Sequence, residues 1–306
     1  MRAKHIRCYK SQSHPSRPSP AILSLEFPVA PAYFAAHMPR QFRLAAIDID
    51  GTLIHGGSLA ISDANRRAVA LMQDTGIEVA LASGRHHASM LSFAAQLPGV
   101  RWMVSSQGAE VSDTPRREII SKVFHSPAAA RHLITLGRRL GYAIVVHADD
   151  NIYRLDAPEK IAAYTGLEGC AIDHLTDDDA LARPLTKVMW TGAADLVFDI
   201  DTHPEVAALD ATRVLTHTYL YELLPPGIDK GAGAARLAAH LAITGAETLA
   251  FGDAENDIPL FRWAGVSFAM PGRWPSARAA ATHTAPGGPP ETAFARAVEM
   301  ALNLQK

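Results

Sequence analysis

The chain has 306 residues, a formal net charge of −2 and a hydrophobic fraction of 48%. The near-neutral charge argues against nucleic acid or an anionic membrane as a partner, and the two cysteines do not suggest a disulfide framework. No uncharged apolar stretch reaches the roughly 18 residues that a membrane helix needs. We therefore expect a cytoplasmic globular protein of about two domains, present as a monomer or a weak homodimer.

The first 37 residues differ in composition from the rest of the chain. They hold five basic residues against one acidic residue, Glu26, together with five serines and five prolines. This composition fits an organelle transit peptide, a disordered tail, or sequence upstream of a start at Met38. We expect residues 1–40 to form a disordered tail.

Residues 41–115 alternate short apolar runs with amphipathic segments. A helix is predicted over 64–75, with Ser62 as its N-cap and Gly76 at its end, and a second helix runs through Phe93. Three apolar runs are typical of buried strands in a parallel sheet: 44–47, 77–82 and 102–104. This βαβαβ order predicts a doubly wound sheet.

The pattern changes near residue 115. From there to about residue 222 the strands alternate more and the loops are polar, which favours a mixed, partly antiparallel α+β domain. Helices are predicted near 127–140 and 157–165. The predicted strands are 142–148, 151–155, 186–191, 196–200 and 213–224.

Parallel organisation returns near Lys230. The predicted elements there are a helix over 231–241, a strand over 248–251, and helices over 259–263 and 291–304. The simplest interpretation is a discontinuous core formed by 41–115 and 223–306, with residues 116–222 inserted. We predict an α/β fold: a doubly wound, Rossmann-like parallel sheet core with an inserted α+β cap domain.

Polar residues follow three of the predicted core strands, at the points where the strands end. In open α/β sheets, ligands bind beyond the carboxyl ends of the strands, so we expect these residues to share one pocket. They are Asp48, Asp50, Ser83, Asp253 and Asp257. The Ser83-Gly84 pair offers a hydroxyl and backbone N–H groups that suit phosphate oxygens, although Ser83 also fits a simple helix cap.

The carboxylates in this set predict a cation. Asp48 and Asp50 lie two apart and point to the same side of a strand. Taken alone, their Asp-x-Asp-Gly motif also occurs in calcium loops and ordinary turns. Together with Asp253 and Asp257 they cannot all ionise unless a cation is present, and oxygen-only ligands favour Mg²⁺. Lys230 adds a further positive charge.

Four ordered motifs resemble those of a known superfamily. The chain reads Asp-Ile-Asp-Gly-Thr-Leu over 48–53, Leu-Ala-Ser-Gly-Arg over 81–85, Gly-Ile-Asp-Lys-Gly over 227–231 and Gly-Asp-Ala-Glu-Asn-Asp over 252–257. In order and spacing they resemble the haloacid dehalogenase-like hydrolase superfamily, and more narrowly its Cof-type phosphatases with a class IIB cap. The resemblance covers about residues 42–306.

The resemblance implies an Mg²⁺-dependent phosphatase that acts on a small phosphorylated metabolite, either a sugar phosphate or a phosphorylated cofactor. It implies that Asp48 is the nucleophile that forms an aspartyl-phosphate. Asp50 would be the general acid and then the general base. Lys230 would neutralise charge as it develops, and Asp257 would orient the other ligands.

Further roles are implied residue by residue. The phosphate-binding residues would be Asp48, Thr52, Ser83, Gly84, Lys230 and Asn256. The metal ligands would be Asp48, Asp253 and Asp50, the last through its backbone carbonyl. Arg85 and Lys187 would contact the substrate.

The chain departs from the family pattern at three places. Gln107 stands where the family usually has Asn, and residues 270–275 read Met-Pro-Gly-Arg-Trp-Pro in place of a small Gly-Asn-Ala turn. Residues 286–290 read Pro-Gly-Gly-Pro-Pro where the family has an Asp-Gly-Val segment. Six residues of the inserted domain are candidates for contact with the substrate, and a surface or packing role is the alternative for each. They are His147, Asp149, Asp150, Tyr153, Lys187 and Trp190. His86 and His87 are expected to be ordinary helix residues.

Two alternatives to a phosphatase stay open at this point. A phosphotransferase or phosphomutase would use the same aspartyl-phosphate. A non-catalytic sensor of phosphorylated ligands would be expected to lose the nucleophile or the acid, and the chain has both Asp48 and Asp50.

Overall fold

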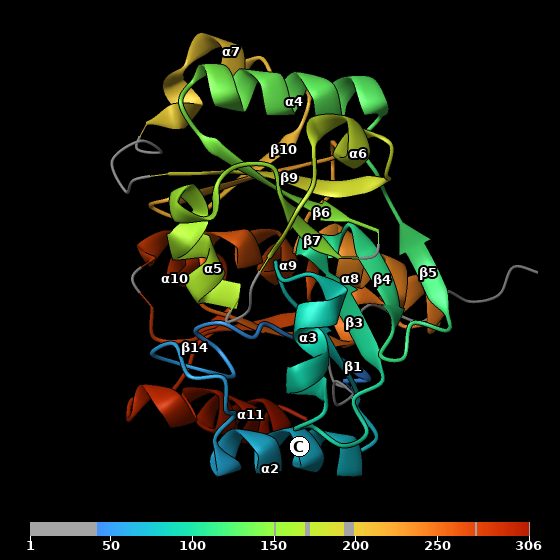
Figure 1. Cartoon of the computed structure of the whole chain (residues 1–306). Helices are drawn as coiled ribbons and strands as arrows, with labels where there is room; N and C mark the ends of the chain where they lie inside the picture. The colour runs from blue at the N-terminus through green and yellow to red at the C-terminus, as the bar shows by residue number, and fades with distance from the viewer. Residues whose placement is uncertain (1–41, 150, 169–171, 193–198, 273, 306) are drawn as a thin grey trace, which may run out of the picture. The chain divides into compact units, whose positions relative to one another are not determined.

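The structure is a computed structural model and describes residues 42–149, 151–168, 172–192, 199–272 and 274–305 (Figure 1). By compactness the chain divides into residues 1–38 and 39–306, and the second unit holds every described residue. The predicted tail lies outside the described residues, as do both cysteines. In the described part of the chain, no helix is both long and apolar enough to cross a membrane.

The core is an eight-stranded sheet with the order β14-β13-β12-β1-β2-β3-β4-β5. Its parallel strands are β1 (Leu44–Ile47), β2 (Glu78–Ala82), β3 (Trp102–Ser105), β12 (Thr248–Gly252), β13 (Val266–Ala269) and β14 (His283–Thr284). An antiparallel hairpin, β4 (Glu110–Asp113) and β5 (Ile119–Lys122), extends one edge. In this sheet β2 and β3 lie on one side of β1, whereas β12, β13 and β14 lie on the other side. The strand order therefore reverses between β1 and β12, which is the topological switch point of the sheet.

Helices cover both faces of the core sheet. The side chains of β1 point alternately to the two faces, and each face belongs to its own apolar layer. Ala45 and Ile47 belong to one layer, and Leu44 and Ala46 to the other. The first layer holds α2 (Asp63–Asp74), α3 (His87–Ala94) and α11 (Ala293–Asn303), with α2 and α11 side by side in Figure 1. The second holds α8 (Lys230–His240), α9 (Ile258–Trp263) and α10 (Pro275–Ala280). The predicted doubly wound α/β core is confirmed.

The inserted cap carries a six-stranded sheet with the order β10-β11-β9-β6-β7-β8. Its strands are β6 (Ala143–Ala148), β7 (Ile152–Arg154), β8 (Asp173–His174), β9 (Leu185–Thr191), β10 (Thr212–His217) and β11 (Leu220–Leu224), antiparallel except for the β7–β8 pair. One face packs on α4 (Pro127–Arg139), α6 (Asp177–Leu181) and α7 (Pro204–Ala207), and the other on α5 (Ala162–Glu168).

Several boundaries differ from the sequence prediction. The stretch 213–224 is a hairpin of two strands rather than one run. Most of the predicted strand 196–200 lies outside the described residues, and Ile200 begins a short 3-10 helix. The expected core–cap boundaries at 115/116 and 222/223 each fall a few residues early. β5 keeps the chain in the core sheet as far as Lys122, and β11 keeps it in the cap sheet as far as Leu224.

Candidate active site

Asp48 follows β1 at the switch point and is almost fully buried. Its backbone N–H donates to the carbonyl of Phe251 in β12 over 2.9 Å. Gly51 has a φ of +82°, and a Cβ there would come within 2.4 Å of the Asp253 carboxylate. Only glycine meets both conditions, so this turn brings the first motif directly against the fourth.

Lys230 is the first residue of α8 and is fully buried. Its Nζ donates to Asp48 Oδ1 and to Asp257 Oδ1, each over 2.6 Å. Burial by itself would lower the pKa of Lys230, but the two carboxylates raise it above its ordinary value. Lys230 is therefore a fixed cation that joins the first, third and fourth motifs.

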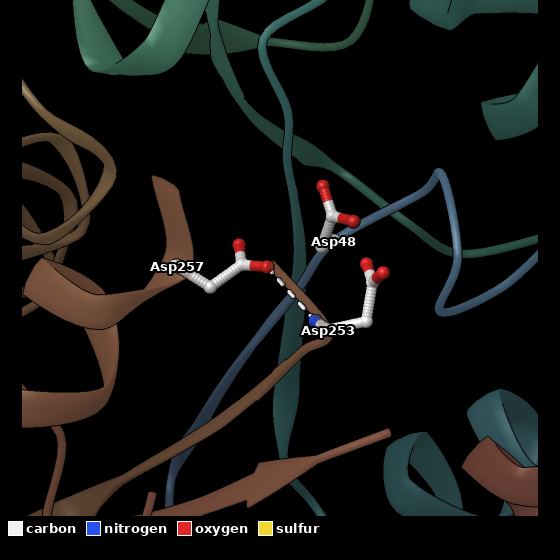
Figure 2. A group of neighbouring side chains, drawn as sticks. All are labelled: Asp48, Asp253 and Asp257. Carbon is white, nitrogen blue, oxygen red and sulfur yellow. Dashed lines mark hydrogen bonds between the residues drawn. The ribbon is translucent and has the colours of Figure 1, made fainter. Parts of the chain in front are cut away.

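Asp48, Asp253 and Asp257 each offer a carboxylate oxygen, and these oxygens lie within 4.8 Å of one another. Figure 2 shows the three side chains converging, with the backbone N–H of Asp253 donating to Asp257 Oδ2 over 2.9 Å. Burial raises the pKa of Asp48 well above its usual range, and the neighbouring carboxylates add to this while Lys230 opposes it. Such an all-oxygen, electrostatically crowded group fits Mg²⁺.

The members of this cluster are not equivalent. Asp257 Oδ2 also accepts from the backbone N–H of Ala254 over 3.1 Å, so both Asp257 oxygens are engaged inside the protein. The Asp50 carboxylate, which was expected to crowd together with the other three, is not in the cluster. Its carboxylate forms a bidentate pair with Arg85, in which Nε and Nη2 each donate over 2.8 Å.

The predicted phosphate-binding turn follows β2. Ser83 is buried, and its Oγ accepts from the backbone N–H of Arg85 over 3.2 Å. A Cβ on Gly84 would come within 2.6 Å of Gln107 Nε2, so glycine allows the 105–109 segment to approach. Thr52 is fully buried, and its hydroxyl has no hydrogen-bond partner among the described residues.

A buried polar network links this turn to the cap. Gln107 Nε2 donates to Glu222 Oε2 over 2.8 Å, and Gln107 Oε1 accepts from Asn256 over 3.2 Å. Lys187 Nζ donates to Glu222 Oε1 over 3.1 Å and to the carbonyl of Gly84 over 2.6 Å. Gln107 holds this position with a φ of +56°, a conformation that Asn adopts more readily. The departure at residue 107 therefore places a longer amide between core and cap.

A cavity of about 550 Å³ opens between the strand ends and the cap. Eight of the predicted residues line it: Asp48, Asp50, Ser83, Gly84, Arg85, Lys187, Asp253 and Asn256. Thr52, Lys230 and Asp257 are not part of its wall. The cavity therefore brings together residues of the first, second and fourth motifs with Lys187 of the cap.

A family model of haloacid dehalogenase-like hydrolases matches residues 45–287. The chain belongs to this family. It is a Cof-type phosphatase, a phosphoric monoester hydrolase.

Similar proteins agree with this assignment. A 5-amino-6-(5-phospho-D-ribitylamino)uracil phosphatase of Bacillus subtilis is 27% identical, covering 75% of this chain and 84% of its own. An HMP-PP phosphatase of Cronobacter sakazakii is 27% identical, covering 79% and 88%. A haloacid dehalogenase-like hydrolase from Bacteroides thetaiotaomicron shares the fold with a TM-score of 0.73 and 23% identity, covering 85% of this chain and all of its own.

Most of the candidate cap residues do not reach the cavity of this hydrolase. His147 is buried, with Nδ1 3.0 Å from Ser106 Oγ, and the buried Trp190 donates to the carbonyl of Leu133 over 3.1 Å. Asp149 pairs with Arg116. Tyr153 lies against Arg183, and Asp150 falls outside the described residues. Of the six candidate cap residues, Lys187 is the one that lines the cavity.

Sequence reasoning missed Glu222. It is the single acidic residue in the otherwise apolar strand 220–224, and that interruption is the signal that singles it out. Glu222 is buried and joins Lys187 to Gln107.

Proposed function

We propose that the chain is an Mg²⁺-dependent phosphatase that works through a phosphoryl group carried covalently on Asp48. The observation that carries this proposal is the placement of Asp48. It is buried at the switch point, bonded to Lys230, grouped with two further carboxylates and in contact with the cavity. A buried carboxylate that lies beside two others requires a cation to stay ionised. Because Asp48 also lines the cavity, it can contact a phosphate ester bound there.

In the proposed first step, an Asp48 carboxylate oxygen attacks phosphorus and the bond to the leaving oxygen breaks. Asp50 gives its proton to that leaving oxygen. In the second step a water attacks the phosphorus of the aspartyl-phosphate, Asp50 takes a proton from this water, and the Asp48 carboxylate is regenerated. A bound Mg²⁺ would neutralise the phosphate and the carboxylates around it.

Other residues hold and orient the groups that react. We propose that Asp48, Asp253 and the backbone carbonyl of Asp50 hold the metal. Asp257 orients Lys230 and the 252–257 turn through the hydrogen bonds it accepts. The proposed phosphate-binding set is Asp48, Thr52, Ser83, Gly84, Lys230 and Asn256, with Arg85 and Lys187 at the substrate. Because Asp50 is paired with Arg85, its carboxyl must turn from that guanidinium toward the leaving oxygen.

Two relatives, by their names, act on a phosphorylated ribitylaminouracil and on HMP-PP, and a solved relative is named as a sugar phosphatase. We propose a sugar phosphate or a phosphorylated cofactor as the substrate of this chain. The two-cysteine composition supports a cytoplasmic setting, and we propose a monomer or weak homodimer.

The test is the release of inorganic phosphate from acetyl phosphate by the purified full chain. We expect release with Mg²⁺, loss of release after EDTA, and recovery when Mg²⁺ is restored. Release that is insensitive to EDTA would contradict the metal dependence. Transfer of the phosphoryl group to added sugars, with little free phosphate, would favour the phosphotransferase alternative.

A further inference from the structure

We propose that Glu222 and Gln107 are positioning residues for the phosphate site, and that they orient the side-chain amide of Asn256 so that its nitrogen donates to a bound phosphate. This inference rests on the proposed function, in which Asn256 is one of the residues that bind the phosphate.

Four side chains form a hydrogen-bonded network from the cap to the core. Lys187 Nζ donates to Glu222 Oε1 over 3.1 Å. Gln107 Nε2 donates to the other oxygen of that carboxylate, Oε2, over 2.8 Å. Asn256 Nδ2 donates to Gln107 Oε1 over 3.2 Å. Glu222 therefore accepts from the cap on one side and from the core on the other.

One orientation of the two amides satisfies this network. A lysine ammonium can only donate, and a carboxylate can only accept. Gln107 must therefore turn its NH₂ group toward Glu222, which leaves its oxygen for Asn256. Asn256 must in turn present its NH₂ group to that oxygen. The charge pair in the cap thus determines how the amides lie in the core.

These contacts are shielded from water. The exposed fraction is 1% for Gln107, 1% for Lys187 and 3% for Glu222. Water therefore cannot readily replace a lost partner, and reversing a single amide would leave two donors or two acceptors facing each other. The orientation of Asn256 is held for this reason.

Asn256 lines the cavity, and its amide nitrogen carries two N–H groups. One of them donates to Gln107, so the other can donate to a phosphate oxygen in the cavity. If the amide were reversed, its oxygen would take the place of the nitrogen and would repel the phosphate. Glu222 therefore acts on phosphate binding through the two amides.

The cap also holds the Ser83-Gly84 turn. Lys187 Nζ donates to the carbonyl of Gly84 over 2.6 Å. That carbonyl shares a peptide group with the backbone N–H of Arg85, which donates to Ser83 Oγ over 3.2 Å. Because Ser83 Oγ accepts this bond, its O–H can donate to a phosphate oxygen. The second and fourth motifs thus each gain a donor for an anion from a contact that involves Lys187.

Glu222→Gln tests the orientation because it keeps the size of the side chain. Lys187 can only donate, so it selects the oxygen of the new amide, and the NH₂ group of that amide then faces Gln107. Gln107 has to reverse, and Asn256 reverses with it. The bond from Lys187 to the Gly84 carbonyl is kept, so the Ser83 side of the site is unchanged.

The experiment measures the dissociation constant of inorganic phosphate by titration calorimetry, on the full chain with saturating Mg²⁺. We expect Glu222→Gln to raise this constant at least about tenfold, which corresponds to the loss of one hydrogen bond to a charged group. In an Asn256→Ala background the same change should raise it less than about twofold, because the amide that reverses is gone. Any direct effect of Lys187 without its carboxylate partner is present in both backgrounds and cancels in the comparison.

Gln107→Met removes the amide that lies between Glu222 and Asn256. Glu222→Gln should therefore raise the dissociation constant less than about twofold when it is added to Gln107→Met. The proposal would be overturned if Glu222→Gln raised the constant equally with and without Asn256, or did not raise it in the otherwise wild-type chain.

Glu110→Gln is the matched control. Glu110 is also a buried carboxylate with cationic partners, Arg116 and Lys122, and it does not line the cavity. We expect this variant to keep the wild-type dissociation constant for phosphate. A rise as large as that in Glu222→Gln would show that the loss of any buried carboxylate weakens phosphate binding, and would overturn the assignment.

The proposed function can fail separately from this inference. If the wild-type chain binds phosphate but releases none from acetyl phosphate with Mg²⁺, the phosphatase proposal is contradicted, and the dissociation constants still decide the role of Glu222. If acetyl phosphate is hydrolysed and Glu222→Gln has the same effect in both backgrounds, the phosphatase proposal stands and this inference fails. A wild-type chain that binds no phosphate would contradict both.

Discussion

Lys230 is buried between two carboxylates. Each of these three groups is stabilised in its charged form by an opposite charge beside it. The Nζ lies 2.6 Å from both Asp48 Oδ1 and Asp257 Oδ1. Removing one member of a buried ion pair leaves an uncompensated charge, which is far more costly than replacing the whole group with neutral side chains.

We therefore predict that Lys230→Met lowers the free energy of unfolding by about 3–5 kcal/mol in the absence of metal. Urea denaturation in EDTA measures this loss. Adding Asp257→Asn to Lys230→Met should recover part of it, because one buried carboxylate is then removed. If the double variant is less stable than Lys230→Met alone, charge compensation is not the role of Lys230.

Individual residues of the site differ in how far the sequence predicts them. Asp48, Lys230 and Asp253 lie in motifs directly after apolar strands or before a helix, so their meeting at one edge of a sheet follows from strand order. Glu222 and Gln107 meet only because the cap folds over the core, 115 residues apart in sequence. Local pattern carries no information about a contact of that kind.

At the scale of elements, the site depends on how closely the turns that follow β1 and β12 approach each other. Gly51 sets that distance, because its backbone lies against the Asp253 carboxylate. Gly76, at the end of α2, has almost the same conformation, with a φ of +83°, but a Cβ there would meet nothing within 4 Å.

These two glycines form a matched pair. Both Gly51→Ala and Gly76→Ala should pay a backbone cost of about 1–2 kcal/mol for a left-handed alanine. Only Gly51→Ala should also displace Asp253, abolishing phosphate release and the rise in melting temperature on adding Mg²⁺. If Gly51→Ala keeps both at the level of Gly76→Ala, close contact with Asp253 is not required.

The elements of the core were more predictable than those of its edge. Buried parallel strands such as β1 and β12 are continuous apolar runs, and Ser62 caps α2 as predicted. The sequence does not predict the β4–β5 hairpin because β4 carries Glu110 and Asp113, two polar residues in a buried strand. Their partners Arg116 and Glu118 lie in the turn of the hairpin itself. The first predicted core–cap boundary, at 115/116, falls too early for the same reason.

At the scale of the whole molecule, buried histidines join core and cap. His86 caps α3 through Nδ1, which accepts from Ala88, and its Nε2 lies 3.2 Å from the carbonyl of Ala148 in the cap. His87 is also buried, beside Glu110. For His86 the expectation of an ordinary helix residue is therefore wrong, since helical spacing gives no sign of its contact with the cap. His87 is the first residue of α3, and its partners Glu110, Ser112 and Thr114 lie in or beside β4 of the core sheet.

Burial lowers the pKa of His86 to about 4. In the unfolded chain His86 binds a proton near pH 6.5, whereas in the folded chain it binds one only near pH 4. The contribution of neutral His86 to the free energy of unfolding is therefore complete above pH 6.5 and is lost as the pH falls from 6.5 to 4. It amounts to about 3 kcal/mol.

We predict that His86→Asn, which can still cap α3, flattens the fall in unfolding free energy between pH 6.5 and pH 4. Urea denaturation across this range measures the slope. His174→Asn, at an exposed position in β8, is the control and should keep the wild-type slope. An unchanged slope in His86→Asn would show that His86 does not control acid stability.

The whole-molecule arrangement also explains why the sequence predicts the core residues of the cavity better than the cap residues. The family's motifs lie in the core, whereas the cavity is completed by cap residues such as Tyr164, His217 and Glu222, which share no motif. Their approach to the strand ends is a property of the folded molecule.

The most direct measurement is steady-state phosphate release from acetyl phosphate by Asp48→Asn with saturating Mg²⁺. The variant is checked for native circular dichroism and cooperative unfolding. If Asp48 carries the phosphoryl group, release by the folded variant should not exceed the uncatalysed rate, because an amide oxygen is too weak a nucleophile to replace the carboxylate. Turnover close to that of the wild type by the folded variant would contradict the mechanism.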